Sequence, residues 1–396
     1  MVAGSVLLVA TLAAGQSDPG TFAAVGPTGE RLVGRLLRLG DGKAEVATSD
    51  GVVTVADVLS LRRVGVARPA FPRGPGLLST TDDRVPGTLL GGSAEVLRFQ
   101  PAATDQAWSV PLPAVSLLWL GTQPAGTPPD PDRVTWLGPN RKRDLLRLRN
   151  GDTATGTIVG FAADGETVTF KSDAGDDRAV PLDSVGVVAF NPALAAARRP
   201  KGSYTLAVLR DGARLHLTEA AADETTLRGK TLFGQAVELP LTRVVALDSL
   251  RGKAVELSTL RPKAEQGGFL GVTWPWAANR TVRGEPLALQ TANGVETFDR
   301  GIGTHPRTVL TYELAGKYRR FEALVGLDPV TGKQGRAVAR VAVDGKDAAV
   351  HDLQPGLAVP MRVELVGAKV VTLTVESGEG GGVQADVNWA DAKVFE

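Results

Sequence analysis

The first 250 residues repeat one short pattern, and this repetition narrows the folds open to the chain. Each copy begins with an alternating apolar segment beside a glycine or aspartate and ends in a small, polar step that leads into valine and leucine. Four such endings align at residues 55–61, 111–118, 181–188 and 240–247. Alternation of Val, Leu, Thr and Phe with a period of two indicates short antiparallel strands that each bury one face.

Turn residues divide these segments as a bent sheet requires. Asn150-Gly151, Asp164-Gly165 and Asp211-Gly212 are predicted hairpin turns, because glycine accepts a positive φ without steric cost. Each repeat is therefore predicted to be a small, strongly bent sheet of the Sm-like or SH3-like kind, alone or paired with another. The predicted repeats are residues 22–66, 77–121, 144–191 and 203–252.

Proline- and glycine-rich connectors separate the repeats. The longest occupies most of residues 122–143, where we predict a Pro-rich linker. Proline fixes φ and lacks a backbone donor, so such stretches favour stiff, extended spacers over core strands.

The last third of the chain has longer alternating strands. They are expected near residues 308–312, 321–325, 337–343 and 370–375, and Asp344-Gly345 marks a hairpin turn. About 140 residues with this alternation and no helical period fit two stacked sheets. The sequence thus predicts an all-β protein: four small β-repeats followed by a jelly-roll β-sandwich at residues 257–396.

Charge and cysteine content exclude several classes of function. The chain carries 44 Lys and Arg against 43 Asp and Glu, scattered along the sequence, so nucleic acid is not predicted as a partner. The absence of cysteine excludes disulfides, thiolate metal sites and cysteine nucleophiles.

The N-terminus resembles a leader segment. An apolar run at residues 2–14 is followed by small and polar residues, which predicts a signal peptide at 1–15 and a secreted, periplasmic or cell-surface protein. No Lys or Arg precedes the run, so a buried N-terminal strand or a mis-set start codon are the alternatives. The run is too short to span a bilayer, and no membrane span is predicted.

One stretch, residues 299–328, is the most specific in the chain. It contains Gly-Ile-Gly-Thr-His at 301–305, Tyr-Glu-Leu at 312–314 and Val-Gly-Leu-Asp at 325–328, and related motifs follow the same order at 279–287, 341–346 and 388–394. Together these motifs resemble the NPCM family of carbohydrate-binding modules, which have a galactose-binding-like fold. The resemblance covers residues 257–396 and implies recognition of a galactose-type glycan and a structural calcium ion. In two places the chain departs from the family pattern: residues 385–389 read Ala-Asp-Val-Asn-Trp where Asp-His-x-Asp-Trp is usual, and Asn279 replaces an aspartate.

Aromatic and histidine side chains are the first candidates for contact with a sugar. Trp274 and Trp276 lie in a loop-like segment, where an exposed indole can stack on a pyranose ring. Either ring can instead fill the end of the sandwich core. His305 follows small residues that admit a close neighbour, and its ring can bond a hydroxyl or serve the scaffold.

Planar polar side chains complete the predicted carbohydrate-binding residues. Arg307, Asp386 and Asn388 carry donors and acceptors that can read hydroxyl stereochemistry. The last two lie where the NPCM family keeps functional polar residues. A glycine run at 378–382 indicates a hairpin tip.

No catalytic pattern is present in the sequence. There is no Gly-x-Ser-x-Gly elbow, and three widely spaced histidines support neither a metal cluster nor a triad. We therefore predict an exported, non-catalytic carbohydrate-binding protein whose repeats are spacers or dock a protein partner. Two alternatives are a structural or protein-interaction protein that has lost sugar binding, and an accessory part of a glycan hydrolase.

Overall fold

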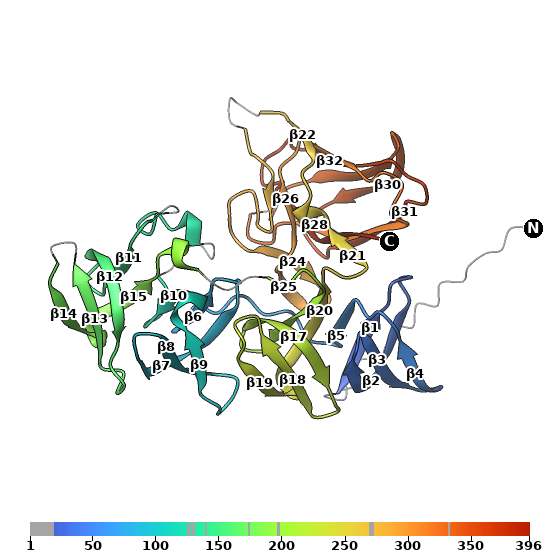
Figure 1. Ribbon diagram of the computed structural model, residues 1–396. Helices are drawn as coiled ribbons and strands as arrows, with labels where there is room; N and C mark the ends of the chain where they lie inside the picture. The colour runs from blue at the N-terminus through green and yellow to red at the C-terminus, as the bar shows by residue number, and fades with distance from the viewer. Residues whose placement is uncertain are drawn as a thin grey trace, which may run out of the picture.

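The computed structural model describes residues 20–124, 127, 131–138, 141–172, 175–195, 199–268, 273–331 and 333–396. The predicted signal peptide lies outside these ranges. The structure is built from β-strands (Figure 1), which confirms the predicted all-β class. The helices in the described residues are three-residue 3₁₀ turns, and none of them could cross a bilayer.

The first twenty strands fall into four groups of five, named units 1 to 4. In every unit the first strand pairs with the second and the fifth, the second with the third, and the third with the fourth, all antiparallel. Unit 1 contains β1 (Thr21–Val25), β2 (Arg31–Gly40), β3 (Lys43–Thr48), β4 (Gly51–Val55) and β5 (Ser60–Arg63). Unit 2 contains β6 (Gly76–Ser79), β7 (Arg84–Gly92), β8 (Val96–Pro101), β9 (Trp108–Pro111) and β10 (Val115–Trp119).

Units 3 and 4 repeat the same connectivity. Unit 3 contains β11 (Asp144–Leu148), β12 (Thr153–Phe161), β13 (Thr167–Ser172), β14 (Asp177–Pro181) and β15 (Val185–Ala189). Unit 4 contains β16 (Tyr204–Leu209), β17 (Arg214–Ala222), β18 (Thr226–Thr231), β19 (Ala236–Pro240) and β20 (Val244–Leu250).

A 3₁₀ turn joins the fourth strand to the fifth in units 2, 3 and 4. These turns are η1 (Leu112–Ala114), η3 (Leu182–Ser184) and η5 (Leu241–Arg243). Each begins with a leucine that is at most 9% exposed. The small, polar segment at the end of each sequence repeat is thus a 3₁₀ turn. It places one leucine in the core between the fourth and fifth strands.

Close backbone approach explains a glycine near the start of the second strand. A Cβ on Gly34, Gly87 or Gly156 would lie 2.2 Å from a carbonyl oxygen of the third strand. The register of the same strand pair shifts a few residues later, which is a bulge that bends the sheet.

We expect Gly156→Ala to lower the free energy of unfolding by about 1–3 kcal/mol, because the methyl group displaces backbone. Urea denaturation measures the loss, and Gly202→Ala, with no atom within 4 Å, is the control; equal stabilities of the two variants would contradict the packing argument.

The units form a row in the order 3, 2, 4, 1 (Figure 1). Strand β10 pairs with β15 between units 2 and 3, and β5 pairs with β20 between units 1 and 4. Units 2 and 4 meet where Arg84 opposes Arg214 and where the fully buried Asp83 accepts bonds from the backbone and ring of His216. One apolar cluster contains side chains from all four units.

The predicted Pro-rich linker contributes to a second apolar cluster. Residues Val134 and Leu137, just after η2 (Pro131–Arg133), are 3% and 2% exposed. They pack with Leu78, Leu117 and Trp119 on the sheet of units 2 and 3. This part of the linker therefore covers a sheet face rather than spanning solvent. Another short turn, η4 (Pro192–Leu194), lies in the next connector.

The C-terminal residues form two packed sheets, named the sandwich. One sheet has the order β23 (Ala277–Ala278), β26 (Gly301–Thr304), β33 (Val387–Phe395), β28 (Arg320–Leu327) and β31 (Val359–Glu364), with β21 (Ala254–Glu256) paired to β33. The other has the order β22 (Lys263–Gln266), β27 (Thr308–Glu313), β32 (Val370–Ser377), β29 (Ala337–Val343) and β30 (Lys346–Leu353). The hairpin β24 (Leu287–Thr291) and β25 (Gly294–Phe298) and the turn η6 (Leu257–Thr259) complete it. Side chains of both sheets, including Phe321, Trp389, Tyr312 and Leu373, form one core.

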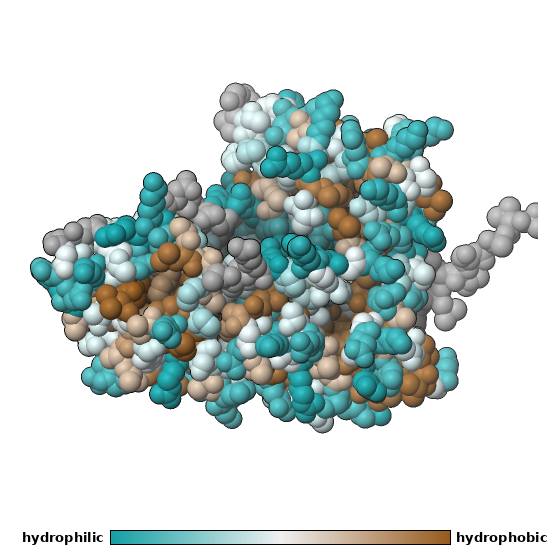
Figure 2. Space-filling model, in the orientation of Figure 1, coloured by the Kyte–Doolittle hydropathy of each residue, from teal (hydrophilic) through white to brown (hydrophobic). Residues whose placement is uncertain are grey.

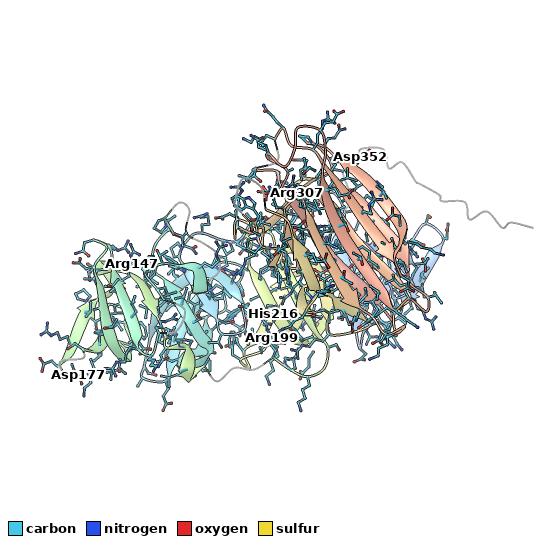
Figure 3. The ribbon with its side chains drawn as sticks, turned by 90° about the horizontal axis from the view of Figure 1, so that it is seen from above. Arg147, Asp177, Arg199, His216, Arg307 and Asp352 are labelled. Atoms are coloured by element: carbon cyan, nitrogen blue, oxygen red, sulfur yellow. The ribbon has the colours of Figure 1, made fainter. Side chains whose placement is uncertain are left out.

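The sandwich covers units 1 and 4, not units 2 and 3. Seen from above, its strands with Arg307 and Asp352 lie over one end of the row, while Arg147 and Asp177 mark the other end (Figure 3). Leu59 of unit 1 packs with Ala254 and Phe395 of the sandwich.

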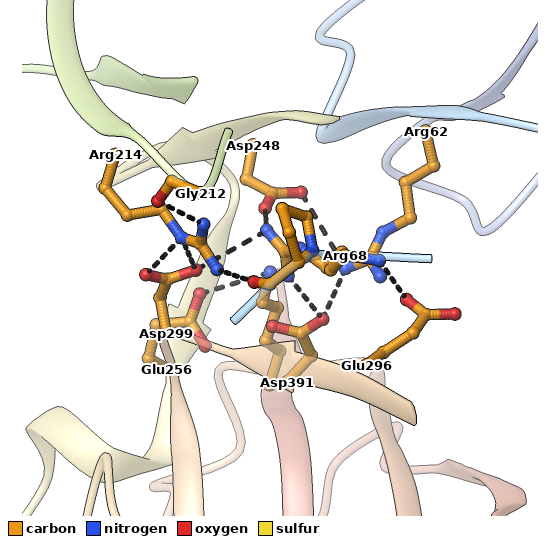
Figure 4. Close-up of polar contacts among 11 residues, drawn as sticks. Arg62, Arg68, Gly212, Arg214, Asp248, Glu256, Glu296, Asp299 and Asp391 are labelled. Carbon is orange, nitrogen blue, oxygen red and sulfur yellow. Dashed lines mark hydrogen bonds and ion pairs between the residues drawn. The ribbon is translucent and has the colours of Figure 1, made fainter. Parts of the chain in front are cut away.

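Buried charges join the two parts at this junction (Figure 4). Arg68, 2% exposed, follows β5 and donates a hydrogen bond to Asp248 of unit 4, and its Nη1 lies 3.6 Å from Asp391 Oδ2 of the sandwich. Arg214 Nε of unit 4 donates to both oxygens of Asp299, at 3.0 and 3.1 Å. The sandwich is thus held against the units by ion pairs that are largely out of contact with water.

Candidate functional site

A buried carboxylate, Asp386, organises the polar site of the sandwich. It precedes β33, while His305 lies between β26 and β27, Arg283 between β23 and β24, and Thr331 after β28. Asp386 is 2% exposed, and its oxygens lie 2.7 Å from His305 Nδ1, 2.7 Å from Arg283 Nε and 3.1 Å from Thr331 Oγ1. Three loops and one strand end are therefore fixed around a single side chain.

The electrostatics of the site keep this carboxylate ionised. Burial disfavours the charged form, but hydrogen bonds from His305 and Arg283 outweigh burial, and the pKa of Asp386 lies below its ordinary value. Arg283 is the exposed partner, with 43% of its side chain accessible. The site therefore presents a cation at the surface over a buried anion.

Trp274 lies close to two of the partners of Asp386, His305 and Arg283. Its ring centroid is 5.6 Å from that of His305, with an interplanar angle of 40°. The Arg283 guanidinium lies 5.0 Å from the Trp274 ring centroid. The sequence leaves open whether Trp274 is a platform for a sugar ring or part of the sandwich core; the structure places it half-buried, with a cation over its ring.

Gly382 lies closely against the His305 ring. A Cβ on Gly382 would lie 3.3 Å from His305 Nε2, the ring nitrogen that does not face Asp386. Gly380 and Gly381 adopt φ values of 88° and 75°, which brings the chain back toward the histidine after β32. The glycine run predicted as a hairpin tip therefore forms one wall of the site.

Three of the six sequence-predicted residues, Trp274, His305 and Asp386, meet here, and three lie elsewhere. Trp276 packs against the sandwich core. Arg307 is exposed, donates to the carbonyl of Gly268 at 3.0 Å, and lines a separate pocket of about 590 Å³.

Asn388, the sixth predicted residue, has an internal position. It is 1% exposed, and its Nδ2 donates to Ala288 O at 3.0 Å and to Asp328 Oδ2 at 3.2 Å. The backbone N–H of Asp328 donates in turn to the carbonyl of Asp386 at 2.9 Å. Asn388 thus positions the strand that carries Asp386 rather than facing solvent.

Sequence reasoning did not name Arg283, Thr331 or Gly382 as site residues. Arg283 lies inside the matched motif at 279–287, which was the available signal. Among the described residues, no three His, Cys, Asp or Glu side chains are grouped so as to hold a metal ion. A calcium ion therefore stays an implication of the family resemblance.

The sandwich matches a known domain family. Residues 253–395 match the family model of the NPCBM/NEW2 domain. Among curated proteins, the chain is 24% identical over 325 residues to a Renibacterium salmoninarum protein named as an endo-alpha-N-acetylgalactosaminidase. That match covers 74% of this chain and 21% of the relative, so the chain spans about a fifth of the relative's length.

Solved carbohydrate-binding modules are among the structures similar to the chain. The CBM51 of Clostridium perfringens GH95, in complex with methyl-galactose, is 24% identical and covers 36% of this chain and 99% of its own, with a TM-score of 0.33. The tandem CBM51 modules of Sp3GH98, from Streptococcus pneumoniae SP3-BS71, are 12% identical and cover 96% of this chain and 95% of their own, with a TM-score of 0.33. The resemblance that the motifs carry is confirmed by the match of residues 253–395 to the NPCBM/NEW2 domain model.

Proposed function

We propose that the chain binds a carbohydrate through the Asp386 site, defined by Trp274, Arg283, His305, Thr331, Gly382 and Asp386. The observation that carries this proposal is the buried Asp386 carboxylate with an exposed arginine, a histidine and an indole fixed around it. Such a group offers planar donors for hydroxyls and an aromatic edge for the apolar face of a sugar ring. The NPCBM/NEW2 assignment supports a glycan as the ligand.

The proposal extends to the type of sugar, the location of the protein and the role of units 1 to 4. A galactose-type sugar is the proposed ligand, because the motifs resemble modules that bind such sugars. The protein acts without catalysis, outside the cell or in the periplasm, where glycans are accessible. Units 1 to 4 are the support that holds the sandwich in a fixed direction, since buried ion pairs join Arg68 and Arg214 to carboxylates of the sandwich.

Arg283→Ala tests this site; because it removes one partner of the buried Asp386, the urea midpoint of the variant is measured first to verify that it is folded. We expect about tenfold or greater loss of affinity on a glycan array and in titration calorimetry with the full chain, since a charged hydrogen bond to the ligand is removed. Arg319→Ala removes an exposed arginine of the same sandwich and is the matched control. Unchanged glycan binding in Arg283→Ala would show that the glycan binds at another site. Failure of the parent chain to bind any glycan would contradict the proposed function.

A protein-interaction role for the units has its own observation. Val33, Val52 and Val53 of unit 1 are 38%, 63% and 41% exposed, and apolar atoms gather at this end of the row in Figure 2. Strand β4, which carries two of these valines, pairs with β3 alone among the described strands. An apolar sheet edge of this kind suits addition of a strand from a partner. Val52→Lys would then abolish co-purification of a partner while leaving glycan binding intact.

An accessory role in glycan hydrolysis is the other candidate. It is favoured by the likeness to the Renibacterium salmoninarum protein, of which this chain covers about a fifth. Release of reducing sugar by the purified chain would support an enzyme, and binding without release would support a non-catalytic module.

A further inference from the structure

A second pocket lies at the junction between unit 1 and the sandwich. Its volume is about 650 Å³, and its walls come from β1, β5 and the connector after β5 on one side and from β25, β28, β31 and β33 on the other. This volume falls within the range of small-molecule sites, which often form between domains. It shares no residue with the Asp386 site.

The floor of this junction pocket has polar atoms that the protein does not satisfy. Arg68 lines the pocket and is 2% exposed, yet its Nε and Nη1 have no hydrogen-bond partner among the described residues. The same holds for Arg63 Nη1 and for Asp248 Oδ1 beside it. Buried polar atoms are almost always paired in native proteins, so a polar occupant is expected above this floor. Three donors lack a hydrogen bond, although one of them, Arg68 Nη1, forms an ion pair with Asp391, and only one acceptor lacks a hydrogen bond. These atoms favour an occupant rich in oxygen.

The charge of the lining points to an anion. Six Arg or Lys side chains line the pocket, against three carboxylates. Arg31 and Arg362 lie at the mouth, where both are exposed, while Arg62 is 30% exposed and bonds Asp391 on the wall. Asp248, Asp299 and Glu256 lie behind the lining and pair with Arg68 and Lys393, so the cations left to attract a negatively charged ligand are the exposed Arg31 and Arg362.

The remaining wall suits a ring rather than a simple ion. Leu324 and Met361 form an apolar side, and Asn293 and Glu296 add an amide and a carboxylate. An inorganic anion would use neither surface. A sugar acid has all three features that the pocket matches: a carboxylate, several hydroxyls and an apolar ring face.

We propose that the junction pocket binds a carboxylate-bearing sugar, with its carboxylate toward Arg31 and Arg362 and its ring against Leu324 and Met361. The choice of a sugar rests on the proposed function, but the position of the site does not. Residues of the units and of the sandwich both contact this ligand, so the units take part in recognition.

Calorimetry on the full chain with D-glucuronate, D-glucose, acetate and inorganic phosphate at one ionic strength tests the proposal. Glucuronate is expected to bind, and the double variant Arg31→Glu, Arg362→Glu is expected to bind it at least about tenfold more weakly, because two mouth cations become anions. Arg178→Glu, on an exposed strand of unit 3, makes one such charge change elsewhere and should leave binding unaltered. Arg283→Ala should also leave glucuronate binding unaltered.

Each other outcome overturns the proposal in a distinct way. Equal affinity for glucuronate and for phosphate or acetate would mean that the pocket binds any anion. Absence of binding by all four compounds would mean that the pocket holds only water. Loss of glucuronate binding in Arg283→Ala, but not in the double variant, would place the ligand in the Asp386 site. Neutral glycans that bind the parent chain but not Arg283→Ala would sustain the proposed function even if glucuronate fails to bind.

Discussion

Replacement of Arg68 by methionine is expected to lower the free energy of unfolding by about 3–5 kcal/mol, because removal of one partner leaves buried charges uncompensated. Arg68 bonds Asp248, and its guanidinium lies within 4 Å of Asp299 and Asp391. Burial lowers the pKa of Arg68, but these three carboxylates outweigh burial and raise it above its ordinary value. Methionine fills a similar volume, so the loss reports charge rather than a cavity.

Urea denaturation of the full chain measures this effect. Arg178→Met removes an arginine that is 73% exposed and should change stability by less than about 0.5 kcal/mol. A loss of similar size in both variants would mean that the junction charges do not hold the two parts together. Because Asp299 and Asp391 obtain their cations from units 1 and 4, the isolated sandwich should also be less stable than the sandwich within the chain.

The secondary structure could be predicted because each strand carries its own period-two pattern. The bent shape of each unit had a local signal too, since glycines such as Gly156 stand where the second strand approaches the third. The pairing of β5 with β20 has no local signal in the sequence. These strands are about 180 residues apart, and their edges become partners through the packing of whole units.

Arg68 shows why the junction could not be predicted. It lies in a proline- and glycine-rich connector, where an arginine usually faces solvent. Its burial depends on Asp248, Asp299 and Asp391, each from a different strand or loop. The local sequence around an arginine does not show whether the side chain is solvated or enclosed by carboxylates from distant parts of the chain.

The candidate site was predictable where family motifs mark it and not elsewhere. The family motifs point to His305 and Asp386, which are 81 residues apart, and the structure brings His305 Nδ1 within 2.7 Å of Asp386 Oδ1. Arg283 also lies inside a matched motif, but nothing in that motif marks it as the partner of a carboxylate 103 residues later. Asn388 was named for its polarity, but a polar side chain on a buried strand serves a neighbouring carboxylate as readily as a ligand.

Asp386→Asn is expected to weaken glycan binding by more than about tenfold and to lower the free energy of unfolding by about 1.5–3 kcal/mol at neutral pH. Asparagine retains the shape and can still accept one bond from His305. Its NH₂ group opposes the Arg283 guanidinium, which then lacks the anion that holds it over Trp274.

The pH dependence of this variant separates charge from shape. The folded pKa of Asp386 lies below the ordinary value of 3.8, so the stability contributed by the carboxylate is complete above that value and is lost as the pH falls through the folded pKa. The stability difference between the parent chain and Asp386→Asn should therefore be constant from pH 7 to pH 5 and shrink below about pH 4. Urea midpoints at pH 7, 5 and 3 measure it. A difference that stays constant down to pH 3 would assign the loss to altered packing, and the Asp386 site would then lack the electrostatic basis on which its proposed function depends.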